Sequence, residues 1–166
     1  ACRHLNKRGG VLVGDVVGLG KTRVASAIAR IMGDDQMLET LILCPKNLTT
    51  MWEEYAHQFK LRAPKVLSQS LAQRELPELP RYRLVIIDES HNFRNKEGKI
   101  YQVIRDYIDR NESKVVLLTA TPYNKTYLDL ASQLRLFLPE QLDIGIRPEG
   151  MLRETGESDF SLRNPN

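Results

Sequence analysis

Four short apolar runs, each continuous rather than alternating, constrain the fold of this chain more than any other feature. They cover residues 11–13, 41–44, 84–87 and 115–118. An uninterrupted apolar run is typical of a strand that is buried on both faces, as in a parallel sheet. A weaker fifth run lies around residues 65–67. The spacing between the runs leaves room for a helix after each strand.

Apolar residues spaced three or four apart mark one face of four expected helices. These residues are Val24, Ile28 and Ile31; Leu48, Met51, Trp52, Tyr55 and Phe59; Ile100, Val103, Ile104, Tyr107 and Ile108; and Tyr127, Leu130, Ala131, Leu134 and Phe137. Strands that alternate with helices predict an α/β fold with a mainly parallel central sheet and helices on both faces. We expect one domain over residues 1–138. Residues 139–166 are expected to be a loosely ordered tail or the start of a further segment.

Composition excludes several classes of protein. No apolar run approaches the roughly 20 residues of a membrane-spanning helix, so no membrane partner is expected. Two cysteines cannot form a disulfide framework, which favours an intracellular compartment. We expect a cytoplasmic protein, nucleoid-associated in a bacterium or nuclear in a eukaryote. The formal net charge of +3 permits a nucleic-acid partner without arguing for one.

A phosphate-binding loop follows the first run. Residues 14–22 read Gly-Asp-Val-Val-Gly-Leu-Gly-Lys-Thr and lead into a helix. Glycines let backbone N–H groups point at a polyphosphate, and the helix N-terminus adds a positive dipole. We expect ATP to be bound by Gly18, Leu19, Gly20, Lys21 and Thr22. Lys21 would reach the β- and γ-phosphates and Thr22 the Mg²⁺ ion. The alternative is a glycine-rich turn without function, since Asp15 stands where the general pattern has glycine.

Two adjacent carboxylates, Asp88 and Glu89, end the third strong run. Buried carboxylates are costly unless a cation or substrate uses them, and ligands of open α/β sheets bind at this edge. We expect Asp88 to hold Mg²⁺, directly or through water, and Glu89 to orient and deprotonate the attacking water. With Lys21 they would be the catalytic residues. The alternative is an apolar run that ends in Asp-Glu by chance.

Four ordered motifs give the chain a resemblance to a known family. They are Asp15-x-x-Gly18-Leu19-Gly20-Lys21-Thr22; Leu43-Cys44-Pro45 followed by Trp52 and Glu54; Asp88-Glu89-Ser90-His91; and Leu117-Leu118-Thr119-Ala120-Thr121-Pro122. From about Gly10 to Phe137 the sequence resembles the first RecA-like lobe of a superfamily-two helicase or translocase. The branch it resembles is that of the Swi/Snf-like DNA-dependent ATPases, which habitually has aspartate at the position of Asp15. The resemblance implies a three-layer RecA-like P-loop NTPase fold.

The resemblance also implies roles for residues outside the phosphate loop. In the family's strand order the run at 115–118 lies between the first and third strong runs. His91, Thr119 and Thr121 would then couple the state of ATP to the rest of the lobe. Nucleic acid, with duplex DNA favoured, would contact Pro45, Lys46 and Asn47. The alternatives are a histidine without a task, threonines that cap a helix, and a chance surface position for Lys46 and Asn47.

A second RecA-like lobe of the same parent chain would complete the ATP site. We expect that lobe, and an upstream glutamine motif, to lie outside this chain. The parent is then an ATP hydrolase and the isolated chain is nearly inactive. Two departures from the branch are Val16, where glutamate is common, and Ser90, where alanine or glycine is common.

Three alternatives to a DNA-dependent motor are open. One is a P-loop ATPase of the signalling or clamp-loader type, for which the motifs at 43–45 and 119–121 are hard to explain. The second is an RNA-directed helicase lobe. The third is a non-catalytic lobe with a residual nucleotide site, although Lys21, Asp88 and Glu89 are all present.

Overall fold

In the part of the chain that the structure describes, five strands form a single sheet in which every neighbouring pair is parallel. The computed structural model describes residues 2–14, 20–93, 95–120, 127–139 and 141. The strands are β1 (Gly10–Gly14), β2 (Thr40–Cys44), β3 (Lys65–Ser68), β4 (Leu84–Ile87) and β5 (Lys114–Thr119), in the spatial order β1-β5-β4-β2-β3. All four strong runs and the weaker fifth run are therefore strands. The strand order expected from the family, with β5 between β1 and β4, is confirmed.

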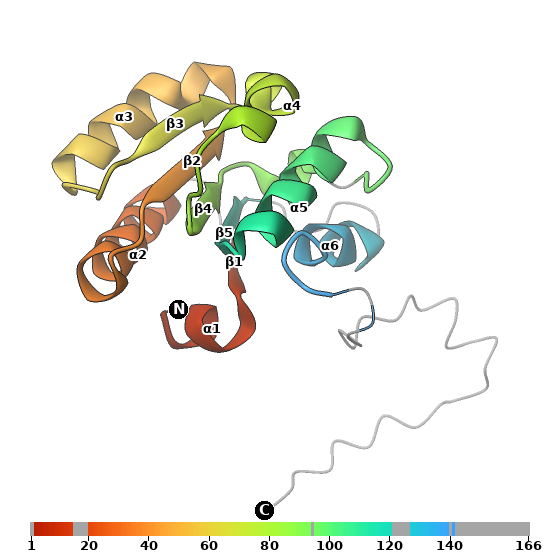
Figure 1. Ribbon diagram of the computed structural model, residues 1–166, viewed down its shortest axis with the longest axis horizontal. Coiled ribbons are helices and arrows are strands. Elements are labelled where there is room, and N and C mark those ends of the chain that lie inside the picture. The colour runs from red at the N-terminus through yellow and green to blue at the C-terminus, as the bar shows by residue number, and fades with distance from the viewer. Residues whose placement is uncertain (1, 15–19, 94, 121–126, 140, 142–166) are drawn as a thin grey trace, which may run out of the picture.

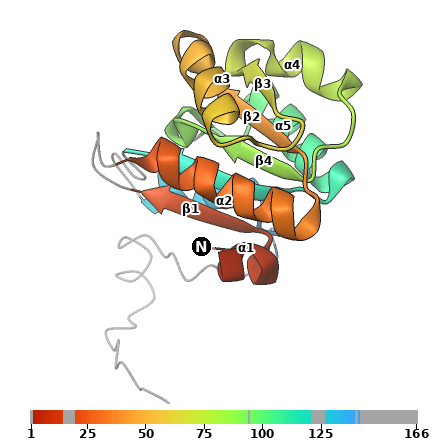
Figure 2. The ribbon, with the colours of Figure 1, turned by 90° about the vertical axis from the view of Figure 1, so that its left-hand side faces the viewer.

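Helices cover both faces of this sheet (Figure 1). They are α1 (Cys2–Arg8), α2 (Lys21–Gln36), α3 (Thr49–Gln58), α4 (Ala72–Glu75), α5 (Lys99–Asn111) and α6 (Tyr127–Leu134). The described residues also form four 3₁₀ turns: η1 (Lys46–Leu48), η2 (Gln69–Leu71), η3 (Leu76–Glu78) and η4 (Ser90–Phe93). Figure 2 looks onto the face where α2 lies along the sheet, with β1 and α1 beside it. The structure has the expected three layers.

The continuous apolar runs fill two separate cores. Ile42 and Cys44 pack with α1, α2 and α3 on one face of the sheet. Leu41 and Leu43 pack with α4, α5 and η4 on the other face. Because side chains alternate along a strand, only a run without polar residues can supply both cores. This is the physical reason why the runs are uninterrupted.

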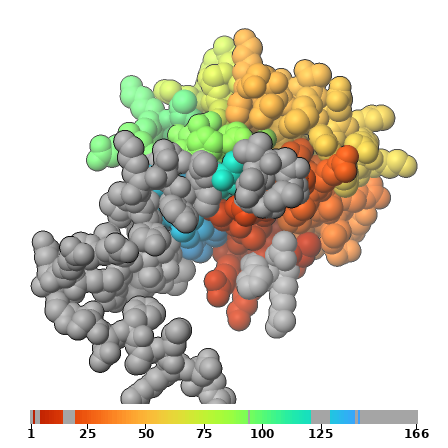
Figure 3. All heavy atoms as spheres, turned by 180° about the vertical axis from the view of Figure 1, so that it is seen from behind, coloured from red at the N-terminus to blue at the C-terminus, as the bar shows by residue number. Residues whose placement is uncertain are grey.

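The parallel register brings the carboxyl ends of β1, β5 and β4 to one edge of the sheet. Gly14 at the end of β1 pairs with Thr119 at the end of β5. Ile87 at the end of β4 pairs with Leu117 of the same strand, β5. In the space-filling view from behind, atoms from the β1–α2 region and from the ends of β4 and β5 meet at the surface (Figure 3). The motifs that follow these strands therefore lie at the same edge.

The packed face of α2 differs from the expected one. Val24 and Ile31 are each 45% exposed, whereas Ala25, Ala29 and Met32 are buried beside Ile28. The buried stripe is thus rotated by about one residue around the helix. Small side chains at Ala25 and Ala29 let the helix lie close to the sheet, and the larger Val24 and Ile31 are left at its rim. Hydrophobic periodicity alone does not weigh side-chain size in this way.

The region around α6 also departs from the expected apolar stripe. Leu130 and Leu134 are half-buried, while Gln133 is fully buried and Leu136, beyond the helix, is 0% exposed. Residues 140 and 142–166 lie outside the described part of the chain, so the expected boundary at residue 138 stays a prediction. Among the described residues, no helix has both the length and the apolar composition needed to cross a membrane.

Candidate functional site

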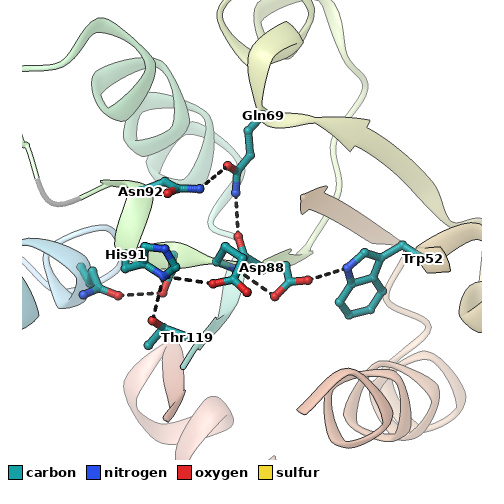
Figure 4. A network of polar contacts seen from close by, with 9 residues as sticks. Trp52, Gln69, Asp88, His91, Asn92 and Thr119 are labelled. Atoms are coloured by element: carbon teal, nitrogen blue, oxygen red, sulfur yellow. Dashed lines mark hydrogen bonds and ion pairs between the residues drawn. The ribbon is translucent and has the colours of Figure 1, made fainter. Parts of the chain in front are cut away.

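Asp88 directly follows β4, and both its backbone and its carboxylate are hydrogen-bonded. Its backbone N–H donates to the carbonyl oxygen of Leu43 (2.8 Å), which extends the β2–β4 pairing by one residue. The indole Nε1 of Trp52 donates to Oδ2 of Asp88 (2.8 Å), and the backbone N–H of Glu89 donates to Oδ1 (2.9 Å). Figure 4 shows the Trp52 and Asp88 side chains facing one another. Asp88 is only 7% exposed, so these donors replace most of its contact with water.

The peptide that follows Asp88 is fixed by a second pair of amides. Nε2 of Gln69 donates to the Asp88 carbonyl oxygen (2.6 Å), and Nδ2 of Asn92 donates to Oε1 of Gln69 (3.1 Å). Glu89 has a φ of 48°, in the left-handed region that costs a non-glycine residue about 1 kcal/mol. The hydrogen bonds of Gln69 and Asn92 hold the chain in this turn. The turn directs the two neighbouring carboxylates in different directions.

Glu89, His91 and Thr119 lie together beyond the ends of β4 and β5. Nδ1 of His91 is 3.0 Å from Oε2 of Glu89 and 3.2 Å from Oγ1 of Thr119. A proton on Nδ1 lies within reach of both oxygens, so this tautomer joins the carboxylate to the threonine hydroxyl. Thr119 is fully buried, whereas the side chains of His91 and Glu89 are about one-third exposed. The structure thus brings together three of the predicted site residues.

Ser90 points away from this group and into the protein. Its hydroxyl donates to Oε1 of Gln133 on α6 (2.7 Å), and both side chains are fully buried. Nε2 of Gln133 in turn donates to the carbonyl oxygen of Asp129 (3.2 Å). The hydroxyl that distinguishes Ser90 from alanine or glycine therefore has a defined partner. It ties the turn after β4 to the helix that follows β5.

The described part of the phosphate loop begins at Gly20. Gly20 has a φ of 85° and precedes the first residue of α2, Lys21, so the chain enters the helix through a conformation that glycine adopts without strain. Lys21 and Thr22 are half-buried in the first turn of α2. This turn contains no acidic residue to oppose a bound anion. The predicted ligands Gly18 and Leu19, and the coupling residue Thr121, lie outside the described residues.

The predicted nucleic-acid contacts follow β2 at the same edge of the sheet. Pro45 is half-buried, and Lys46 and Asn47 are exposed at the start of η1. The hydroxyl of Thr49 donates a hydrogen bond to the Lys46 carbonyl oxygen (2.9 Å), and this bond stabilises the turn. The side chains of Lys46 and Asn47 are open to a partner. Their role in nucleic-acid binding stays a prediction.

Cys44 is the fully buried residue that ends β2, as expected for a small hydrophobic side chain. Burial raises the pKa of its thiol to about 12, and the negative charges of Asp88 and Glu53 add to the effect. Cys44 therefore stays a neutral thiol beside the carboxylate cluster. It contributes packing rather than a nucleophile.

Sequence reasoning assigned Trp52 to the core and overlooked Gln69, Asn92 and Gln133. Trp52 is indeed 0% exposed, but a buried indole N–H needs an acceptor, and that requirement was the available signal. Gln69 directly follows β3, so its place after a strand was a second signal. Neither signal names the acceptor, because the partners are distant in the sequence.

The side-chain oxygen atoms at this edge of the sheet are suitable ligands for a magnesium ion. Each oxygen of the Asp88 carboxylate accepts one hydrogen bond from nitrogen and keeps a further lone pair. Carboxylate and hydroxyl oxygens are the ligands that Mg²⁺ prefers, and Thr22 adds a hydroxyl at the start of α2. The residues present therefore fit the ion that the motifs imply.

Solved structures share this fold. The SWI2/SNF2 ATPase core of Sulfolobus solfataricus, in complex with dsDNA, matches with a TM-score of 0.69 and 22% identity, over 84% of this chain and 33% of that chain. The Hef helicase domain of Pyrococcus furiosus matches with a TM-score of 0.68 and 17% identity, over 82% of this chain and 34% of that chain. These matches define the fold as an α/β RecA-like fold.

Curated proteins add similarity in sequence to this similarity in fold. An uncharacterized ATP-dependent helicase of Bacillus subtilis, YqhH, is 30% identical over 81% of this chain and 27% of its own length. A SWI/SNF-related regulator of chromatin, the subfamily A-like protein 1 homolog of Caenorhabditis elegans, is 26% identical over 80% of this chain and 22% of its own length. No protein-family model matches the chain. Together with the shared fold, these relatives support a superfamily-two helicase lobe of the Snf2-like kind. The chain spans about a quarter of the length of these relatives.

Proposed function

We propose that this chain is the ATP-binding motor lobe of a DNA-dependent ATPase of the helicase or translocase type. The observation that carries the proposal is the meeting of three strand ends at one edge of the sheet. There the start of α2 with Lys21 and Thr22 follows β1, Asp88 and Glu89 follow β4, and Thr119 ends β5. This is the edge at which α/β proteins bind their ligands. The names of the relatives, an ATP-dependent helicase and a SWI/SNF-related regulator, support the same function.

In this proposal each residue at the edge has one task in ATP hydrolysis. Lys21 balances phosphate charge, and Thr22 and Asp88 supply oxygen ligands to magnesium. The ion, when bound, neutralises charge on the phosphoryl group that is transferred. Glu89, which is partly open to solvent, accepts the proton of the attacking water. The loop residues Gly18, Leu19 and Gly20 would cradle the phosphates with their backbone N–H groups.

His91 is proposed to connect this chemistry to the rest of the lobe. It contacts both Glu89 and Thr119 through one nitrogen, so a shift of the Glu89 carboxylate changes the hydrogen bond available to Thr119. Thr119 lies at the end of β5, directly before the segment that contains Thr121. A change at the γ-phosphate would reach that segment along this path.

The remaining assignments complete the proposed motor. Pro45, Lys46 and Asn47 would contact the backbone of duplex DNA, and a second RecA-like lobe of the parent chain would close over the ATP. The Sulfolobus structure that shares this fold was solved in complex with dsDNA, which supports the choice of DNA. We propose a cytoplasmic location, at the nucleoid of a bacterium or in the nucleus of a eukaryote. Residues 1–138 would form the lobe.

The test is ATP turnover by the full-length parent protein with and without double-stranded DNA. We expect stimulation by duplex DNA, and a loss of about 10²- to 10⁴-fold in the Glu89→Gln variant, because that change removes a general base. Glu78→Gln is the matched control. Glu78 is exposed in η3, which precedes β4 and so lies away from the carboxyl edge. It should turn over ATP as the unaltered protein does.

Four outcomes would contradict parts of the proposal. The absence of stimulation by any nucleic acid would exclude the motor function and favour another P-loop ATPase. If RNA but not DNA stimulated ATP turnover, the nucleic-acid partner would be RNA. Turnover unaffected by Glu89→Gln would exclude the proposed mechanism. For the isolated chain we expect hydrolysis near background, and robust hydrolysis would show that no second lobe is required.

A further inference from the structure

The contact between Trp52 and Asp88 links a helix in the core to the carboxylate at the edge. Trp52 lies in α3, is 0% exposed, and is the only tryptophan of the chain. Its indole has one N–H donor and no acceptor, so a buried indole can satisfy this group with a single partner. That partner is Oδ2 of Asp88, at 2.8 Å (Figure 4). The bond joins residues 36 positions apart.

The hydrogen bonds around Asp88 leave the Trp52 indole to determine the orientation of the carboxylate. Its backbone N–H is bonded to Leu43 and its carbonyl oxygen to Gln69, so the main chain of Asp88 cannot rotate freely. The carboxylate itself has two described donors, the Glu89 backbone N–H on Oδ1 and the Trp52 indole on Oδ2. Of these two donors, only the Trp52 indole belongs to a side chain, and it comes from a different element, α3. Hydrogen bonds to a charged acceptor in a buried setting are stronger than neutral ones.

We propose that Trp52 is a positioning residue whose indole N–H fixes the orientation of the Asp88 carboxylate at the edge of the sheet. With Oδ1 and Oδ2 each held on one side, the plane of the carboxylate is set and its remaining lone pairs face the edge where the ion would bind. The expected effect on magnesium binding rests on the proposed function, whereas the hydrogen bond between the indole and the carboxylate does not. Because Trp52 is the one tryptophan in the sequence, its indole N–H signal also reports on the acceptor at Asp88.

The first experiment tests the pair without any activity. A ¹⁵N-labelled sample of the chain gives one indole N–H signal in an NMR correlation spectrum, because the chain has one tryptophan. Asp88→Asn replaces the charged acceptor by a neutral one, and we expect the indole proton to move upfield. Glu53→Gln is the matched control: it makes the same chemical change at the exposed neighbour of Trp52 in the sequence. We expect the control signal to stay at its original position.

The second experiment tests positioning in the full-length parent protein. Trp52→Phe keeps an aromatic ring in the core and removes the N–H donor. We expect the Mg²⁺ concentration for half-maximal ATP turnover to rise about tenfold, which corresponds to about 1.4 kcal/mol. The KM for ATP at saturating Mg²⁺ should change less than twofold. Tyr55→Phe is the control, since it removes an aromatic hydroxyl from the half-buried face of the same helix.

The outcomes separate this inference from the proposed function. An indole signal that is equally displaced in Asp88→Asn and Glu53→Gln, or in neither, overturns the pair. A Mg²⁺ requirement that Trp52→Phe leaves within twofold of the unaltered protein overturns the positioning role, whatever happens to the melting temperature. A parent protein without any ATP turnover contradicts the proposed function, and the NMR comparison then decides on the pair alone.

Discussion

Gly10 offers a sharp test of how tightly the lobe is packed at the start of β1. A Cβ atom at this position would lie 2.3, 2.4 and 2.6 Å from Cδ2, Cγ and Cε2 of Phe137. These distances are far inside van der Waals contact, so the ring closes directly over the glycine. Phe137 follows α6, and Gly10 opens the strand that leads into the phosphate loop. The contact therefore joins the first strand of the sheet to the segment that follows α6.

Two opposing effects decide the outcome of Gly10→Ala. Gly10 lies in a strand and does not have the positive φ that would exclude alanine. Without Phe137, alanine would stabilise the fold by about 0.4–1 kcal/mol, because it restricts the unfolded chain. The clash with the ring acts in the other direction, and overpacking typically costs about 1–3 kcal/mol. We expect the clash to win, with a net loss of about 1–2 kcal/mol in the free energy of unfolding.

The assay is urea unfolding followed by the fluorescence of Trp52. The matched background is Phe137→Ala, which removes all three clashing ring atoms; leucine would retain Cγ and is unsuitable. In that background Gly10→Ala should change sign and stabilise the protein by about 0.4–1 kcal/mol. The packing argument would be refuted if Gly10→Ala made the protein with Phe137 more stable than the unaltered protein. It would also be refuted if Gly10→Ala changed the free energy of unfolding equally with Phe137 and with Phe137→Ala.

Three further predictions concern buried groups near the site. A thiol-alkylating reagent at pH 8 should label half-buried Cys2 in the folded chain and reach Cys44 only after urea unfolding, as mass spectrometry of the labelled peptides would reveal. Because the folded pKa of Cys44 is raised from 9.0 to about 12, its contribution to stability is complete below pH 9 and falls as the pH rises toward 12; Cys44→Ala should make alkaline unfolding less steep. Ser90→Ala removes the buried donor to Gln133 and should lower the free energy of unfolding by about 1–3 kcal/mol. Combined with Gln133→Leu it should cost less than the sum of the two single changes, and strictly additive losses in urea titrations would show that the two side chains do not interact.

Much of the fold and the outline of the site were predictable from local patterns. The apolar runs predicted the strands because a strand buried on two faces has no position for a polar side chain. The motifs after β1, β4 and β5 predicted a shared edge because parallel strands end on the same side. The buried face of α2 was predicted less well. Periodicity marks an apolar stripe, but the sizes of Ala25 and Ala29 decide which side of that stripe lies against the sheet.

Pro77 and Pro80 are residues typical of a loop, whereas the structure has two short helical elements before β4, α4 and η3. Pro77, however, lies in the first turn of η3, where a missing N–H is no loss because that group has no partner within the helix. Leu76, directly before it, is fully buried against the core on the α5 side of the sheet. Tertiary packing thus turned a proline-rich segment into short helical turns.

By itself, the sequence determined the five strands, the resemblance to one family, and the types of residue that gather at the carboxyl edge. These follow from alternation, spacing and local motifs, which act over a few residues. Only the tertiary structure decided which neighbours hold those residues in place. Trp52 and Gln69 reach Asp88 across 36 and 19 positions, and Ser90 reaches Gln133 across 43. Such pairs form because β2, β3 and β4 are adjacent in the sheet and α6 packs against η4, and no local pattern encodes that adjacency.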